Sequence, residues 1–131
     1  MNGEKEKPDG AARRAPRSLG EWEDWYETRT GEAFELVEGE NILWHPQKGF
    51  ASWVLSRDEL YIHQVAGDGR YWKDALTLLA RSLGVHSASL WSARNPKSLI
   101  RRLGLKPKGD GWYELKDDGR PIRLPVFPWK G

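Results

Sequence analysis

Hydrophobic and polar residues follow two different periods on either side of a glycine turn in the middle of the chain. Residues 60–65 (LYIHQV) form a short, largely apolar and aromatic run, which predicts a strand. After the turn at residues 67–69 (GDG), apolar residues recur at spacings of three and four, which predicts a helix over 70–83 that ends at Gly84. The apolar face of that helix comprises Trp72, Ala75, Leu76, Leu79 and Leu83.

A second strand and a second helix are predicted after this helix. Residues 85–91 (VHSASLW) predict the strand. We expect it to bury its large apolar residues, Val85, Leu90 and Trp91. An Asn-Pro pair at residues 95–96 favours the start of a short helix, which we expect to end at Gly104. The four segments form a β-α-β-α unit, whose two strands we expect in one sheet with a right-handed crossover.

The chain before this unit predicts one helix and an antiparallel meander. Ser18 and Glu21 have the spacing of a capping box, and aromatic residues behind them recur at helical spacing, so we expect a helix over 19–28 that Gly31 stops. Strands are then expected at residues 34–38, 41–44 and 50–56. Because the connections are short, these strands should pair antiparallel with one another and with residues 60–65.

The C-terminal part predicts a final hairpin. Residues 108–111 (KGDG) read as a turn, and residues 112–116 (WYELK) alternate as a strand does. Residues 121–126 (PIRLPV) are at most an edge strand, because their prolines cannot donate to a ladder. The predicted fold class is therefore α/β, with one mixed sheet of about six strands and three helices.

Composition sets the number of domains and the compartment. A chain of 131 residues is long enough for one domain, which we expect over residues 17–131, its core anchored by several of the eight tryptophans. Residues 1–16 hold no large apolar residue except Met1, so they predict a disordered tail. Without cysteine, a signal-peptide segment or a membrane-length apolar run, the sequence favours a cytoplasmic protein with no membrane association.

Two side chains of the central strand are candidate acid–base groups. His63 shares a strand face with Tyr61, opposite Leu60, Ile62 and Gln64, and histidine is the usual general base near neutral pH. Glu59 opens the same strand. Each has a plainer interpretation: Glu59 as a solvated turn residue and His63 as a structural histidine. The other histidines have no neighbouring ligand pattern, so no metal site is expected.

Net charge is only +2, which gives no general argument for nucleic acid binding. The positive charge is nevertheless concentrated, since no acidic residue occurs between Arg94 and Lys108. That run contains Arg94, Lys97, Arg101, Arg102, Lys106 and Lys108. It could meet the phosphate of a small ligand, a nucleic acid or an acidic partner, or it could be a solvated helix face.

The order of these segments resembles the Gcn5-related N-acetyltransferase (GNAT) family over residues 34–116. Residues 64–69 (QVAGDG) match the family's acetyl-CoA motif Q/R-x-x-G-x-G. The helix that follows has the expected length, and residues 93–104 (ARNPKSLIRRLG) resemble the family's Asn-led helix that ends in Leu-Gly. The resemblance implies acetyl-CoA as cosubstrate and a small-molecule or protein amine as acceptor.

The resemblance also assigns expected roles to particular residues. It implies that residues of the glycine turn and the first helical turn bind the pyrophosphate, namely Gly67, Asp68, Gly69, Arg70 and Tyr71. The backbone of Ile62 to Gln64 would lie along the pantetheine, which Asn95 would also touch. Glu59 or His63 would act as the base.

Three departures from the family favour a second interpretation, a non-catalytic binding protein with this fold. The loop before the Gly-x-Gly is short, and the Asp68 carboxylate is placed to cap the helix itself. Ile100 stands where the family often has a tyrosine that protonates the departing thiolate. Small, reduced domains of this kind also resemble proteins of phage or prophage origin.

Overall fold

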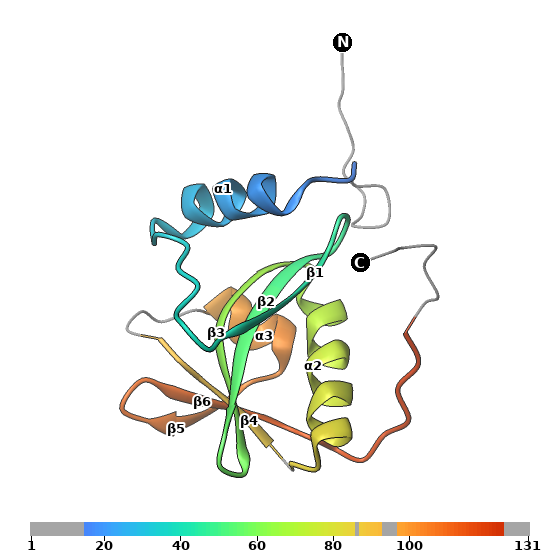
Figure 1. The fold of residues 1–131 in the computed structure, drawn as a ribbon. Helices are drawn as coiled ribbons and strands as arrows, with labels where there is room; N and C mark the ends of the chain where they lie inside the picture. Colours follow the sequence, from blue (N-terminus) through green and yellow to red (C-terminus); the bar gives the residue numbers. More distant parts are fainter. Residues whose placement is uncertain (1–14, 86, 93–96, 125–131) are drawn as a thin grey trace.

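The computed structural model describes residues 15–85, 87–92 and 97–124, which form three helices and one six-stranded mixed sheet (Figure 1). The predicted α/β class with a mixed sheet is confirmed. The greater part of the predicted disordered tail lies outside the described residues, as do Arg94 and Asn95.

The sheet has the strand order β1-β2-β3-β4-β6-β5. β1 (Asn41–His45), β2 (Gly49–Ser56) and β3 (Glu59–Gly67) form an antiparallel meander. β4 (Ser87–Trp91) lies parallel to β3, and α2 (Gly69–Leu83) connects the two strands. β5 (Lys106–Gly109) and β6 (Trp112–Lys116) form a hairpin, with β6 inserted beside β4.

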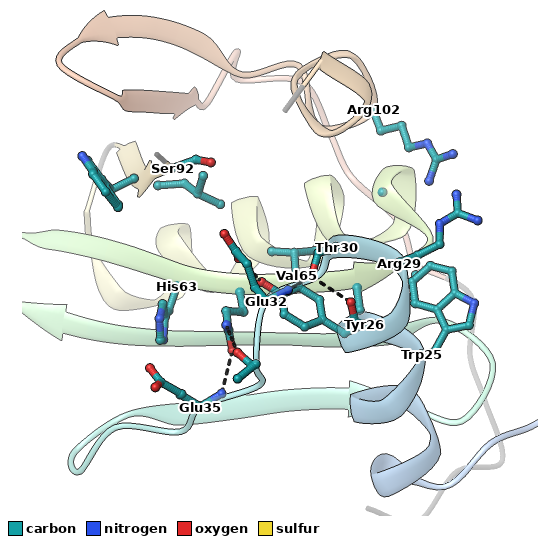
Figure 2. A pocket seen from close by; sticks show the side chains of 17 residues that line it. Trp25, Tyr26, Arg29, Thr30, Glu32, Glu35, His63, Val65, Ser92 and Arg102 are labelled. Atoms are coloured by element: carbon teal, nitrogen blue, oxygen red, sulfur yellow. Dashed lines mark hydrogen bonds between the residues drawn. The ribbon is translucent and has the colours of Figure 1, made fainter. Parts of the chain in front are cut away.

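The helices cover different parts of the sheet. α1 (Leu19–Thr30) begins at the predicted capping box of Ser18 and Glu21 and buries Trp22 and Tyr26 in a cluster that includes Ala66. α2 packs on a larger cluster with residues of β3, β4 and β6, and α3 (Lys97–Leu103) packs beside α2. Figure 2 shows α1 in front of the strands and α2 behind them, so the two helices lie on opposite faces of the sheet.

A β-bulge in β3 decides which residues face which helix. Between the pairs Ala51–Val65 and Trp53–Ile62, β2 contributes only Ser52, whereas β3 contributes His63 and Gln64. Ser52 is fully buried, and its hydroxyl accepts the backbone N–H of Gln64 at 3.0 Å.

The bulge corrects the predicted alternation along β3. Leu60 and Ile62 belong to the cluster under α2, whereas Ala66 belongs to the cluster under α1 and Val65 packs toward α2. Gln64 is buried with them, yet its side chain bonds the segment after α1. The expectation that Leu60, Ile62 and Gln64 share one face is therefore confirmed for Leu60 and Ile62 and wrong for Gln64.

Residues 34–38 are not the predicted strand. The N–H groups of Phe34, Glu35 and Val37 donate to side chains, and the described residues pair no strand with this segment. Glu27 accepts the N–H of Phe34 at 2.8 Å, and Gln64 accepts the N–H of Glu35 at 3.1 Å. The segment is thereby fixed at the end of α1 and at β3, and its Glu35 lies on the same side of the view as His63 (Figure 2).

The structure also differs from the predictions in the bounds of other elements and in the burial of one tryptophan. Trp91 is 51% exposed, not buried, and its indole N–H donates to the carbonyl of Asp110 at 3.1 Å in the β5–β6 turn. Glu59 is the first residue of β3 and not a turn residue. Lys108 and Gly109 belong to β5, which shortens the predicted turn, and residues 121–124 form no strand.

Candidate functional site

β3 and β4 separate where the bulge begins. They pair through Leu60–Ala88, Tyr61–Ser89 and Ile62–Leu90, and within the described residues no further pair follows, although β3 continues to Gly67. A parallel pair that opens in this way leaves backbone donors and acceptors of β3 without a ladder partner on that side. The gap is therefore suited to a ligand that can bond along an exposed strand.

A cleft of about 550 Å³ occupies this gap. Its walls come from segments far apart in the sequence: α1 and the segment after it on one side, β4 and α3 on the other, and β3 as the floor (Figure 2). Lining residues include Trp25, Tyr26, His63, Val65, Leu90 and Trp91. The cleft is large enough for the arm of a cofactor or a small substrate.

One end of the cleft is positively charged. Arg29 from α1 and Arg102 from α3 line it, and Figure 2 shows both guanidinium groups at the same end. The Arg29 guanidinium lies 5.1 Å from the ring centre of Trp25, and the described residues form no ion pair with either arginine. Two guanidinium groups without a carboxylate partner favour an anionic ligand at this end.

The other end carries a histidine oriented by a carboxylate. His63 Nδ1 lies 2.9 Å from Glu40 Oε2, and the Glu40 side chain is only 11% exposed. Glu40 is held in turn by the N–H of Val37, which donates to its Oε1 at 3.1 Å. The described residues place no hydrogen-bond partner on His63 Nε2, so this nitrogen is available to a ligand in the cleft.

Glu59 lies in a second, smaller cleft. This cleft of about 290 Å³ opens between the start of β3 and the β5–β6 hairpin. The buried Ser89 hydroxyl donates to Glu59 Oε2, Tyr61 donates to Glu59 Oε1 at 3.4 Å, and Lys108 Nζ lies 3.8 Å from Oε2. The structure thus separates Glu59 from His63, so the two predicted candidates do not act on one atom.

The structure of the glycine turn differs from the pyrophosphate-binding turn that the resemblance implied. Gly67 ends β3, Gly69 begins α2 and Asp68 is the N-cap, accepting the N–H groups of Arg70 and Tyr71 at 3.1 and 3.2 Å. Asp68 also forms an ion pair with Lys48 at 3.4 Å. The first donors of α2 are therefore already used by the chain itself.

Both glycines also have structural reasons. A Cβ on Gly67 would overlap the carbonyl of Lys48, and one on Gly69 would overlap the Cβ of Arg102. Gly67 and Gly69 still line the main cleft, but they do so beside the Arg102 side chain.

The remaining predicted residues are dispersed. Arg70 is exposed and lies outside both clefts, and Tyr71 packs at 4.8 Å on Trp72, where burial raises the pKa of its phenol. Ile62 is the last residue paired with β4, and the Gln64 side chain is used structurally. Lys97 and Arg101 are exposed on α3 outside the clefts, and Ile100 packs against the core under α2.

The sequence analysis missed Glu40 and Arg29. Both lie outside the recognised motif, in a turn and at the end of the first helix. Only the tertiary fold brings Glu40 to His63 and Arg29 to Arg102, so no local pattern could have singled them out.

Comparisons with protein-family models, with curated proteins and with solved structures give no match to this chain. Within the described residues there is no cluster of histidine and acidic side chains that could hold a metal ion. The helices that the structure describes are all too short or too polar to cross a membrane.

Proposed function

We propose that the protein is a small acyl-CoA-dependent N-acyltransferase that transfers an acetyl group to an amine. The observation that supports this most is the cleft between the separated strands, which has an oriented histidine at one end and, at the other, two guanidinium groups that form no ion pair with the described residues. The order of elements, an antiparallel meander followed by a β-α-β-α unit and a C-terminal hairpin in one mixed sheet, also supports the proposal.

The cleft suggests a direct transfer. An amine that enters as an ammonium ion loses one proton to His63 Nε2, and Glu40 stabilises the imidazolium that forms. The neutral amine then attacks the thioester carbonyl; the new C–N bond forms and the C–S bond breaks. The second amine proton passes to the departing sulfur, so the products are the amide and free coenzyme A, with one proton released to solvent.

The coenzyme would lie along β3. Its pantetheine amides would bond the unpaired backbone of His63 to Gly67, as an added strand does. Its phosphates would lie at Arg29 and Arg102 and not on the donors of α2, which Asp68 caps. This placement is compatible with the structural roles of Gly67 and Gly69, because it does not require the N–H groups of the glycine turn to bind the phosphates.

Calorimetric titration with acetyl-CoA, followed by an acetyl-transfer assay, tests this function. We expect micromolar binding, about −8 kcal/mol, and a loss of about 100-fold in kcat in His63→Gln with little change in acetyl-CoA affinity. Glu40→Gln should lower kcat less and shift its pH dependence. The absence of binding at millimolar acetyl-CoA by a folded protein would disprove the proposal.

A second candidate function is supported by Asp68. Because its carboxylate occupies the first donors of α2 and places negative charge near the cleft, the fold could serve as a non-catalytic binding protein. Its partner would be acidic or a nucleic acid, bound through the exposed cations Lys97, Arg101 and Arg102. Salt-sensitive binding that weakens in an Arg101→Ala/Arg102→Ala variant, without any acetyl-CoA binding, would support this function.

A further inference from the structure

Among the helices that the structure describes, none covers the face of β3 between the two clefts. Glu59, Tyr61 and His63 alternate along the strand, while Leu60 and Ile62 between them face the cluster under α2. α1 covers only the far end of the same face, where Ala66 lies in its cluster. The uncovered part of the face therefore connects the smaller cleft at Glu59 with the main cleft at His63.

Both ends of this face are acidic. At the His63 end, Glu32 and Glu35 line the cleft and Glu40 lies behind the imidazole. Figure 2 shows Glu32, Glu35 and His63 on the side of the cleft away from Arg29 and Arg102. At the other end, Glu59 and Asp110 outnumber the single cation Lys108 in the smaller cleft.

The surface between the ends is aromatic. Tyr61 packs edge-on against Trp112, with ring centres 5.9 Å apart, and Trp112 is 37% exposed. Trp91 lines the main cleft and is 51% exposed. Aromatic rings beside carboxylates attract ammonium groups and accommodate methylene chains, and they do not favour a carboxylate or phosphate.

We propose that the amine acceptor is an elongated di- or polycation of the polyamine class. Its reacting amine lies at His63 and a second ammonium group at Glu59 in the smaller cleft. Four residues of strand separate these positions, which corresponds to about 13 Å. This inference rests on the proposed acyl transfer and adds the class of acceptor to it.

Two acceptors of the same length test the charge preference. 1,8-Diaminooctane and 8-aminooctanoate present the same reacting amine on the same chain, but one ends in an ammonium group and the other in a carboxylate. We expect kcat/KM for the diamine to be at least about tenfold higher than for 8-aminooctanoate. Glu59 attracts the far ammonium group of the diamine, whereas it repels the far carboxylate of the amino acid. Equal values, or no turnover of the diamine, would overturn the inference.

Substitutions in the smaller cleft test whether Glu59 is responsible for the preference for the diamine. Glu59→Gln keeps an oxygen for the Ser89 hydroxyl and should raise KM for the diamine about fivefold, as expected for a half-exposed ion pair. Asp58→Asn removes the same charge from the adjacent turn, outside both clefts, and should leave KM unchanged. Lys108→Met removes the competing cation and should lower KM, which keeps the inference testable if Glu59→Gln does not fold.

The outcomes separate the inference from the function on which it rests. If acetyl-CoA does not bind, both fail. If acetyl-CoA binds and both acceptors react equally, or if Asp58→Asn weakens the diamine as much as Glu59→Gln does, only the polycation assignment fails.

Discussion

Gly67 and Gly49 face each other where β2 and β3 pair, and neither position has room for a side chain. Gly67 has φ +101° and Gly49 has φ +106°; a Cβ on Gly67 would overlap the carbonyl of Lys48, just before β2, and a Cβ on Gly49 would overlap the carbonyl of Ala66. Two glycines at one pair let the strands approach closely just before α2 begins. The close approach of the chain at this pair is therefore sufficient by itself to require glycine at position 67.

Gly67→Ala should therefore destabilise the fold strongly. The left-handed conformation costs a residue with a side chain about 1–2 kcal/mol, and the overlap with the Lys48 carbonyl adds about 1–3 kcal/mol. Gly84→Ala is a matched control, because Gly84 has φ +78° but open space around it. Urea unfolding should show the larger loss for Gly67→Ala; equal losses would mean that the strands separate without cost.

The acetyl-CoA motif shows what residue letters can and cannot predict. The sequence correctly predicted a strand, a glycine turn and a helix, and it anticipated that Asp68 would cap that helix. It could not predict that Gly67 is opposed by the Lys48 carbonyl or Gly69 by Arg102, since both partners are distant in sequence. A glycine pattern indicates where the backbone needs a conformation or a close approach that a side chain would prevent. It does not identify the neighbouring group that makes this necessary.

At the scale of elements, the bulge in β3 controls the site. It turns Gln64 toward the segment after α1 and coincides with the point at which β4 leaves β3. Sequence alternation continues through the bulge without a break, because Leu60, Ile62, Gln64 and Ala66 are all buried. The helices and most strands were predictable from local pattern, whereas a one-residue shift between strands leaves no signal in that pattern.

Ser52→Ala tests the bulge. The substitution leaves the buried N–H of Gln64 without its acceptor, which should cost about 1–3 kcal/mol. Ser56→Ala, at the exposed end of the same strand, should cost less than about 0.5 kcal/mol. Urea unfolding compares the two, and acetyl-CoA titration of Ser52→Ala would show whether the cleft requires the bulge. Equal stability of the two variants would contradict a structural role for Ser52.

At the scale of the whole molecule, the cleft has opposite charge at its two ends. Its positive end joins the last turn of α1 to the last turn of α3, and its acidic end joins the segment after α1 to β3. A ligand with an anionic tail and a cationic partner would therefore be oriented before it makes close contact. This polarity arises only when the two halves of the chain come together.

The positive end gives the sharpest prediction about the coenzyme. Arg102→Gln and Arg29→Gln should each weaken acetyl-CoA binding about five- to tenfold, because each removes a guanidinium group from the phosphates. Arg101→Gln removes the same charge from the neighbouring position of α3, outside the cleft, and should have little effect. Glutamine keeps the aliphatic stem with which Arg102 covers Gly69, so the fold is preserved.

Acetyl-pantetheine, which lacks the nucleotide and its pyrophosphate, provides the decisive comparison for these variants. If the arginines bind phosphate, the variants should weaken acetyl-CoA and leave acetyl-pantetheine unchanged, and added salt should reduce the difference between the two ligands. If Arg101→Gln weakens acetyl-CoA as much as Arg102→Gln does, the attraction is a general effect of positive charge. If both ligands weaken equally, the arginines support the shape of the cleft, and the phosphates bind elsewhere.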